Sequence, residues 1–163
     1  MSDIQALAAE IVTAIGQAGP NGPMIALAES CTGGMVTAAI TDVAGSSAAL
    51  DRGFVTYSND AKMNMLGVAA ATLQTFGAVS TQTAIEMVGG VLRAAPKADL
   101  AVAVTGIAGP GGGSPDKPVG LVHFASQKRG EAAIAAHHIF EGDRADIRDA
   151  ATYTALGMIR KYL

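Results

Sequence analysis

Residues 25–37 read IALAESCTGGMVT, an apolar run that ends in a carboxylate, a hydroxyl and a thiol before two glycines. The run 24–28 has the length of a strand and is wholly apolar, which is typical of a strand covered on both faces. Residues 35–43 then have helical character. The stretch therefore predicts a strand, a turn and a helix, with reactive side chains gathered on the turn.

The rest of the chain alternates helical and strand patterns. Ser2 and Gln5 form a capping-box pattern ahead of a helix expected over 2–18. Further strands are expected at 53–57, 100–104, 119–125 and 132–139, and further helices at 60–66, after Ser80 and from 143 to about 162. The short connection 127–130 predicts a hairpin. Together these elements predict one domain over 1–163, a three-layer α/β/α fold with a mixed, mainly parallel sheet.

Composition narrows the classes of partner. The formal net charge is −3 and no run of Lys or Arg occurs, so we expect small anions as ligands and no nucleic acid. No uninterrupted apolar stretch reaches the roughly 18 residues that a spanning helix needs, and the first residues lack the layout of a signal peptide. We therefore expect a cytoplasmic protein with no membrane contact.

Metal-binding patterns are missing from the sequence. Cys31 is the only cysteine, which excludes an intrachain disulfide and a multi-cysteine metal site. The histidines at 123, 137 and 138 do not form the i, i+4 pair of a metalloprotease. We expect neither a metal nor another cofactor.

Ligands of open α/β sheets collect at strand carboxyl ends, and three stretches compete for that position. They are 29-ESCTGG-34, 57-YSNDAK-62 and 105-TGIAGPGGGSPDKPVG-120. None matches the dinucleotide fingerprint or the phosphate-binding loop of ATPases. Free backbone N–H groups on such turns suit a phosphate or a developing oxyanion, and we assign this role to the turns at Thr32, Gly33, Gly34 and Gly106.

Two serines are candidate nucleophiles. Ser30 lies on a strand-to-helix turn, where a hydroxyl is exposed beside N–H groups, as at the nucleophile elbow of α/β-hydrolases. The alternative is that Ser30 or Thr32 only caps the following helix. Ser47 is the rival nucleophile, in a loop where serines are ordinary turn residues. Ser30 is the leading candidate of the two, and the choice between them stays open.

The chain resembles the C-terminal domain of the CinA proteins. The resemblance rests on five blocks in the same order: ALAESCTGG, GSSAALDRGFVTYSNDAK, GAVS, TGIAGPGGGSPDKPVG and FEGDRADIR. Leu121 and His123 depart from the threonine and aromatic residue common in the family, and we expect packing differences only. The family's stand-alone members hydrolyse the carboxamide of nicotinamide mononucleotide to nicotinic acid mononucleotide and ammonia. The resemblance implies the same metal-independent reaction here, as part of pyridine nucleotide recycling.

The resemblance also implies roles for particular residues. It places Tyr57 and Lys62 in the active site, where a deprotonated lysine acts as general base and the tyrosine holds or passes a proton. Arg144 starts the last helix and is assigned to the substrate phosphate. Thr105 is expected to donate to the substrate carbonyl or ribose, or else to tie down its own turn.

Other polar residues receive weaker assignments. Glu29 is either an orienting acid behind the site or a helix-start carboxylate. Cys31 is expected to be a buried filler. Lys117 is expected to be a solvated loop residue, with closure over a ligand as the alternative, and Arg148 a surface or interface charge. The three histidines are left out of the site.

A second class of function stays open at this stage. The same cleft suits a nucleotide-binding regulatory module linked to competence, without turnover. The complete set Ser30, Tyr57, Lys62, Thr105 and Arg144 favours the enzyme. An alanine-rich surface and the habit of the family lead us to expect a homodimer.

Overall fold

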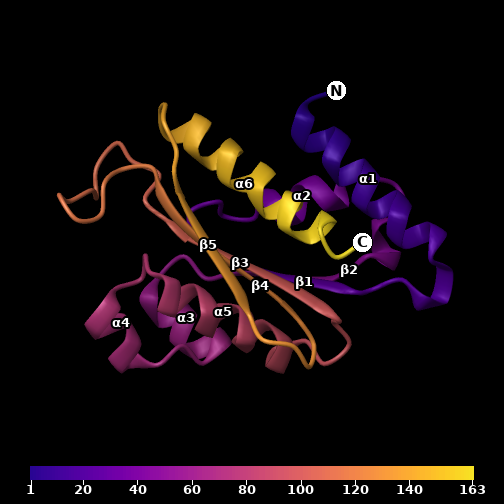
Figure 1. Ribbon diagram of the computed structural model, residues 1–163, viewed down its shortest axis with the longest axis horizontal. Helices are drawn as coiled ribbons and strands as arrows, with labels where there is room; N and C mark the ends of the chain where they lie inside the picture. The colour runs from indigo at the N-terminus through magenta and orange to yellow at the C-terminus, as the bar shows by residue number, and fades with distance from the viewer.

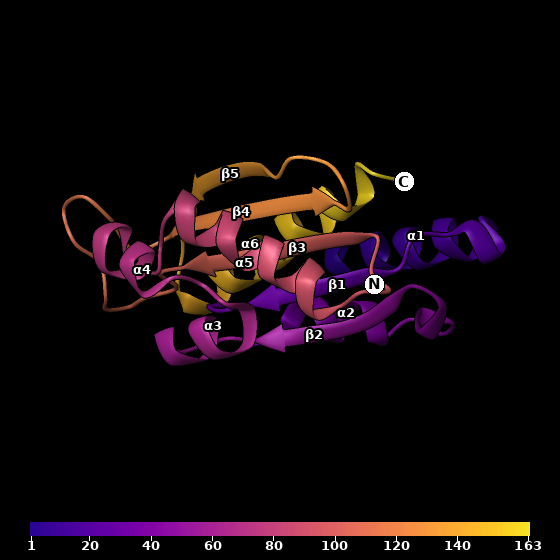
Figure 2. The same ribbon diagram turned by 90° about the horizontal axis from the view of Figure 1, so that it is seen from below.

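Five strands form one open sheet in the computed structural model, which describes residues 1–163. The strands lie in the order β2-β1-β3-β4-β5, and β4 alone runs against the others (Figure 2). Their bounds are β1 Ile25–Glu29, β2 Leu50–Val55, β3 Leu100–Gly106, β4 Leu121–Lys128 and β5 Ile134–Ile139. The carboxyl ends of β1, β2 and β3 therefore meet at one edge of the sheet.

Helices cover both faces of this sheet (Figure 1). On one face lie α1 (Asp3–Gln17), α2 (Met35–Thr41) and α6 (Arg144–Arg160). On the other lie α3 (Asn59–Leu66), α4 (Ala70–Phe76) and α5 (Thr81–Ala94). The expected α/β architecture with a mixed sheet is confirmed.

The alternation of β1 divides the core between the two faces. Ile25 and Leu27 belong to the larger apolar cluster, which α1, α2 and α6 cover. Ala26 and Ala28 belong to the smaller cluster under α5. Because successive strand side chains point to opposite faces, the IALAE pattern gives one face bulky residues and the other small ones. Small residues let α5 lie close to the sheet.

Helices α3 and α5 also approach each other closely. A Cβ atom at Gly90 of α5 would lie 2.1 Å from the Leu66 carbonyl oxygen at the end of α3, a distance that real side chains do not reach. Arg93, also on α5, donates from Nη2 to the same oxygen at 3.2 Å. The position of α3 is thus set by its contact with α5.

Most predicted elements occur close to their expected bounds. The Ser2–Gln5 capping box is present at α1, and β4 and β5 form the predicted hairpin. Strand β2 begins at Leu50, earlier than expected, and α4 was not predicted. Helix α4 has only seven residues and no side-chain cap, so its sequence carries no start signal. None of the helices has the length and apolarity that crossing a membrane requires.

Candidate active site

A cavity of about 280 Å³ lies at the carboxyl ends of β1 and β3, beside α3 and the amino end of α6. It contains six of the predicted site residues: Ser30, Tyr57, Lys62, Thr105, Gly106 and Arg144. Its other lining residues are Cys31, Asn59, Ala78, Val79, Ile107, Ala108, Gly109, Gly111 and Gly112. The glycine-rich segment and the turns after β1 and β2 therefore meet around one space.

Lys62 and Ser30 form the polar centre of this cavity. Ser30 directly follows β1, and Lys62 lies in the second turn of α3, whose amino end is capped by Ser58. The Lys62 Nζ atom lies 3.0 Å from the Ser30 Oγ atom and 2.9 Å from the Thr56 carbonyl oxygen. Lys62 is only 1% exposed. An amine within hydrogen-bond distance of a hydroxyl is the geometry that proton transfer requires.

The surroundings of Lys62 favour its neutral form. No carboxylate forms an ion pair with it, although it is buried. Burial lowers the pKa of the Lys62 amine, because a charged ammonium loses its hydration there, and the nearby Cys31 thiol opposes this effect more weakly. A larger share of Lys62 is therefore able to accept a proton near neutral pH than of an exposed lysine.

The environment of Cys31 keeps its thiol protonated and is therefore unsuited to a nucleophile. Its side chain is 5% exposed, and burial raises the pKa of the thiol to about 11. A thiol with that pKa is protonated at neutral pH, and only the thiolate attacks readily. The prediction of a buried filler agrees with this environment.

Glu29 is bound by the turn that follows Ser30 and by the first residues of α2. Its Oε2 atom accepts hydrogen bonds from the Thr32 hydroxyl (2.7 Å), the Gly34 N–H (3.0 Å) and the Val36 N–H (3.1 Å). Its Oε1 atom accepts two more from the N–H and hydroxyl of Thr37, at 2.8 and 2.7 Å. The carboxylate therefore replaces a conventional N-cap and holds the helix start against the end of β1. Of the two predicted roles, the helix-start role is the one this geometry supports.

Three residues of this turn, Thr32, Gly33 and Gly34, were predicted to contact the substrate. The Thr32 hydroxyl and the Gly34 N–H are already donated to Glu29, and Thr32 is fully buried. Gly33 and Gly34 have φ angles of 60° and 105°, so they form the left-handed bend of the turn. None of the three lines the cavity, since the Thr32 and Gly34 donors bind Glu29 and the Gly33 N–H donates to the Ser30 carbonyl at 3.0 Å.

Tyr57 and Arg144 form the mouth of the cavity. Arg144 donates from Nη2 to the Tyr57 hydroxyl at 3.0 Å and from Nη1 to the Gly109 carbonyl at 2.8 Å. Both residues are exposed, with Tyr57 at 60%. Asp143 caps α6 through the N–H groups of Ala145 and Asp146, and these hydrogen bonds lower the pKa of its carboxyl. Arg144 thus provides a cation between the cavity and solvent.

Thr105 and Lys117 hold loops in place. The Thr105 hydroxyl donates to the Ala78 carbonyl at 2.8 Å, so its proton is not free for the substrate. This bond fixes the segment before α5 that lines the cavity. Lys117 binds the Phe76 carbonyl at the end of α4, where the helix dipole favours a cation. The Thr105 bond matches the alternative in which this residue ties down a turn, and Lys117, expected to be solvated, binds a backbone carbonyl instead.

Ser47 lies at the other end of the sheet. It belongs to the short 3₁₀ helix Ser46–Ala48, directly before β2, whereas Ser30 follows the end of β1. Since β1 and β2 are parallel and Ile25 pairs with Leu50, the two serines are separated by the length of a five-residue strand, about 16 Å. Within one chain, Ser47 is therefore not brought to Lys62.

Arg148 is a residue of this region whose contacts the sequence did not predict. Its guanidinium donates from Nε to the Cys31 carbonyl and from Nη2 to the Thr32 carbonyl, both at 3.1 Å. The only sequence signal was its position four residues after Arg144, on the same side of α6. Arg148 thus binds the turn formed by residues 31–34, which follows Ser30 and is called the nucleophile turn below. It is not a free surface charge.

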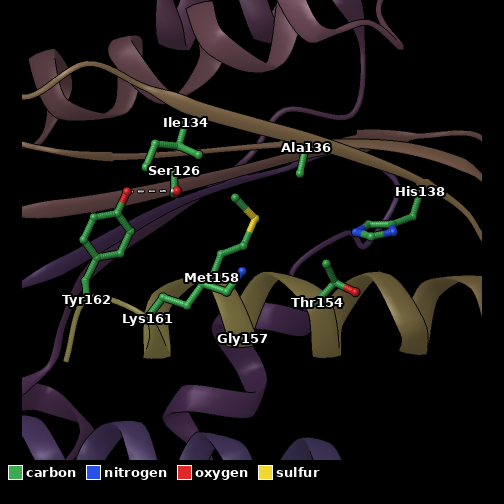
Figure 3. Close-up of a pocket in the computed structure, with 9 residues that line it drawn as sticks. All are labelled: Ser126, Ile134, Ala136, His138, Thr154, Gly157, Met158, Lys161 and Tyr162. Atoms are coloured by element: carbon green, nitrogen blue, oxygen red, sulfur yellow. Dashed lines mark hydrogen bonds between the residues drawn. The ribbon is translucent and has the colours of Figure 1, made fainter.

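A second hollow, of about 320 Å³, lies between β5 and α6 (Figure 3). The Ser126 and Tyr162 hydroxyls are hydrogen-bonded there at 3.1 Å, and His138 and Met158 also line it. None of the predicted site residues lies in this hollow. The Ser30–Lys62 pair is not part of this hollow.

Comparison with known proteins agrees with the architecture. Residues 5–163 match the sequence profile of the CinA C-terminal domain. The chain is 51% identical over 140 residues to the nicotinamide-nucleotide amidohydrolase PncC of Enterobacter agglomerans, and the match covers 85% of each chain. It is 54% identical over 136 residues to PncC of Escherichia coli K12, covering 83% of this chain and 81% of that protein.

Solved structures show the same fold. The competence/damage inducible protein CihA from Agrobacterium tumefaciens superposes with a TM-score of 0.92 at 52% sequence identity, covering 99% of this chain and 96% of that one. A longer relative, the CinA-like protein of Citrifermentans bemidjiense, is 50% identical over 143 residues, which are 34% of its length. The profile match, the identities and the shared fold show that the chain belongs to the CinA C-terminal domain family.

Proposed function

We propose that the protein hydrolyses the carboxamide of nicotinamide mononucleotide, giving nicotinic acid mononucleotide and ammonia. The observation that carries this proposal is the buried Lys62 Nζ atom 3.0 Å from the Ser30 Oγ atom, inside a cavity. The relatives named nicotinamide-nucleotide amidohydrolase, at 51% and 54% identity, support the choice of substrate. The assignment of roles to individual residues is our own.

The first step is the attack of Ser30 on the carboxamide carbon. Neutral Lys62 takes the hydroxyl proton of Ser30 as the new C–O bond forms, which turns a weak nucleophile into an effective one. The lysinium then returns a proton to the amide nitrogen, the C–N bond breaks and ammonia leaves. Water, deprotonated by Lys62, hydrolyses the acyl-enzyme, and the proton returns to Ser30. Lys62 thus gains one proton and gives one proton back in each of the two steps.

Backbone N–H groups are suited to the developing oxyanion. The N–H of Cys31 and the N–H of Ala108 donate to no oxygen of the chain, and both residues line the cavity. The Ser30 carbonyl accepts from the Gly33 N–H at 3.0 Å, which holds the peptide group that carries the Cys31 N–H. Preorganised donors of this kind supply the largest share of stabilisation in amide hydrolysis.

The phosphate belongs at the mouth of the cavity. A volume of about 280 Å³ lies just below the 300–1,000 Å³ typical of small-molecule sites, and suits the pyridine ring and ribose better than the whole mononucleotide. A larger cavity of about 650 Å³, distinct from the hollow between β5 and α6, adjoins the first cavity and shares Ala108 and Arg144 with it. We therefore assign the phosphate to Arg144, with Tyr57 orienting its guanidinium.

The test is ammonia release from nicotinamide mononucleotide. Wild type is expected to form ammonia and nicotinic acid mononucleotide in equal amounts, also after dialysis against EDTA, whereas Ser30→Ala is expected to form neither. Trapping by hydroxylamine should give the hydroxamate only with Ser30 present. If the mononucleotide binds and no ammonia appears, the protein is a binding module, the alternative function. If Ser30→Ala stays active while Ser47→Ala does not, the assignment of the nucleophile is wrong.

A further inference from the structure

We propose that Arg148 is a positioning residue for the nucleophile turn, acting through two backbone carbonyls and not through the substrate. This inference rests on the proposed function for its kinetic consequences, but its structural part stands on the contacts alone. Arg148 holds the peptide groups that follow Ser30, and thereby sets the direction of the Cys31 N–H, which we assign to the oxyanion.

The contact uses one edge of a rigid fork. Nε and Nη2 of one guanidinium bind the carbonyls of Cys31 and Thr32, each at 3.1 Å. Two parallel donors on a planar group fix both distance and angle, which a lysine ammonium cannot do. The two carbonyls are separated from Arg148 by more than a hundred residues in sequence, so the contact is a tertiary constraint on the turn.

Peptide planarity transmits this constraint toward Ser30. A trans peptide points its N–H opposite to its C=O, so binding the Thr32 carbonyl also orients the N–H of Gly33. That N–H donates to the Ser30 carbonyl at 3.0 Å, and the Ser30 carbonyl shares a peptide group with the Cys31 N–H. Arg148 therefore controls, through two hydrogen-bonded peptide groups, the donor that we assign to the oxyanion.

The rest of α6 supports the position of Arg148. Ile147, beside it, is 1% exposed and belongs to the larger core cluster, so the first turns of the helix are anchored. Arg144, one turn earlier, binds the Tyr57 hydroxyl and the Gly109 carbonyl. One helix thus holds the nucleophile turn and the mouth of the cavity at a fixed separation. The positive charge of Arg148 also acts on the turn, where it helps to lower the pKa of the Cys31 thiol against the dominant effect of burial.

The experiment compares Arg148→Met and Arg148→Lys with Arg160→Met. Arg160 lies on the last turn of the same helix and makes only an exposed ion pair with Glu10, at 3.6 Å, so Arg160→Met is the matched control. Two readouts are taken. The first is kcat and KM for ammonia release from nicotinamide mononucleotide. The second is hydrogen exchange, by NMR, of the Gly33 amide and of the Met35 amide, which donates to the Thr32 carbonyl at 3.2 Å. The second readout does not depend on catalysis.

Arg148→Met is expected to lower kcat about 10- to 100-fold, the scale of a small misplacement of reacting groups, and to leave KM within about twofold. Exchange of the Gly33 and Met35 amides should accelerate at least about tenfold, because the turn opens locally. Arg148→Lys keeps the charge and loses the fork, so its kcat should stay about tenfold below wild type. Arg160→Met should change neither readout.

Several results would overturn the proposal. A raised KM with kcat preserved would make Arg148 a phosphate ligand, since it also lines the larger cavity. Unchanged amide exchange in Arg148→Met, or full activity of Arg148→Lys, would remove the positioning role. If Arg148→Met does not fold, Arg148→Lys decides by the same two readouts. If wild type releases no ammonia, the proposed function fails, and amide exchange alone still decides whether Arg148 holds the turn.

Discussion

Glu29 and Lys62 lie on two sides of Ser30, and both are 1% exposed, yet their surroundings differ. Glu29 accepts five hydrogen bonds from the turn before α2 and the start of that helix, whereas Lys62 makes two and has no carboxylate partner. A buried carboxylate whose two oxygens accept several hydrogen bonds is compensated for its lost hydration, so Glu29 has a structural role. A buried amine with few partners is costly as a cation and is therefore available as a base.

Replacing Lys62 should cause the largest loss of activity, while the stability of the protein increases. Lys62→Met is expected to lower kcat by at least about 1,000-fold, because it removes the general base. Its free energy of unfolding should rise by about 1 kcal/mol, since a buried amine that has no carboxylate partner is removed. Steady-state kinetics and urea unfolding measure the two quantities, with the exposed Lys161→Met as control. A less stable Lys62→Met protein would contradict the comparison.

Replacing Glu29 should mainly affect stability. Glu29→Gln puts an NH₂ group among donors, so at least one buried N–H or hydroxyl loses its acceptor. The free energy of unfolding should fall by about 2 kcal/mol. Glu10→Gln, a change on the exposed surface of α1, should shift it by less than about 0.5 kcal/mol. Chemical denaturation of the three proteins checks this, and equal stabilities would show that Glu29 is not part of the framework.

Replacing Arg144 tests the mouth of the cavity, away from both buried charges. Arg144→Ala should raise KM about 10- to 100-fold, because a charged hydrogen bond to the phosphate is lost. It should leave kcat within about threefold. The substrate without its phosphate provides the control, because wild type and variant should process it alike. An equal fall in kcat and kcat/KM would instead indicate a role in the transition state.

The smallest effect should be on the pH dependence of stability. Burial lowers the pKa of Lys62, so between that pKa and the ordinary value of 10.5 the unfolded chain holds a proton that the folded protein lacks. The stability of wild type relative to Lys62→Met should therefore rise with pH in this window, by at most about 1.4 kcal/mol per unit. Unfolding of both proteins from pH 7 to pH 9 measures it. A difference that falls with rising pH would exclude a lowered Lys62 pKa.

Sequence patterns predicted the parts of the site that depend on strand ends. An apolar strand followed by Ser30, and a second one followed by Thr105, had to meet at one edge of a parallel pair. The burial of Lys62 was not predictable from local pattern, because α3 is a short helix whose inward side depends on its contact with α5. The family blocks, and not the periodicity, linked Lys62 to Ser30.

The contacts that sequence patterns did not show have a common physical origin. The donors of Thr32 and Gly34 were expected to face a ligand, but a turn N–H or hydroxyl has the same sequence signature when it faces the preceding carboxylate. A single arginine such as Arg148 on a helix is usually solvated, so only the tertiary fold revealed its two carbonyl partners. Ser47 was an ordinary turn serine in the sequence, and strand direction separated it from Ser30.

The bare backbone at Gly90 has a consequence for the chemistry at a distance. Because Leu66 ends the same short helix that carries Lys62, a methyl group added at Gly90 would push that helix outward as a rigid body. The amine would then withdraw from the serine hydroxyl, although no atom of the cavity had been altered. The spacing between α3 and α5 thus sets the distance between the Lys62 amine and the Ser30 hydroxyl, on which the proposed proton transfer depends.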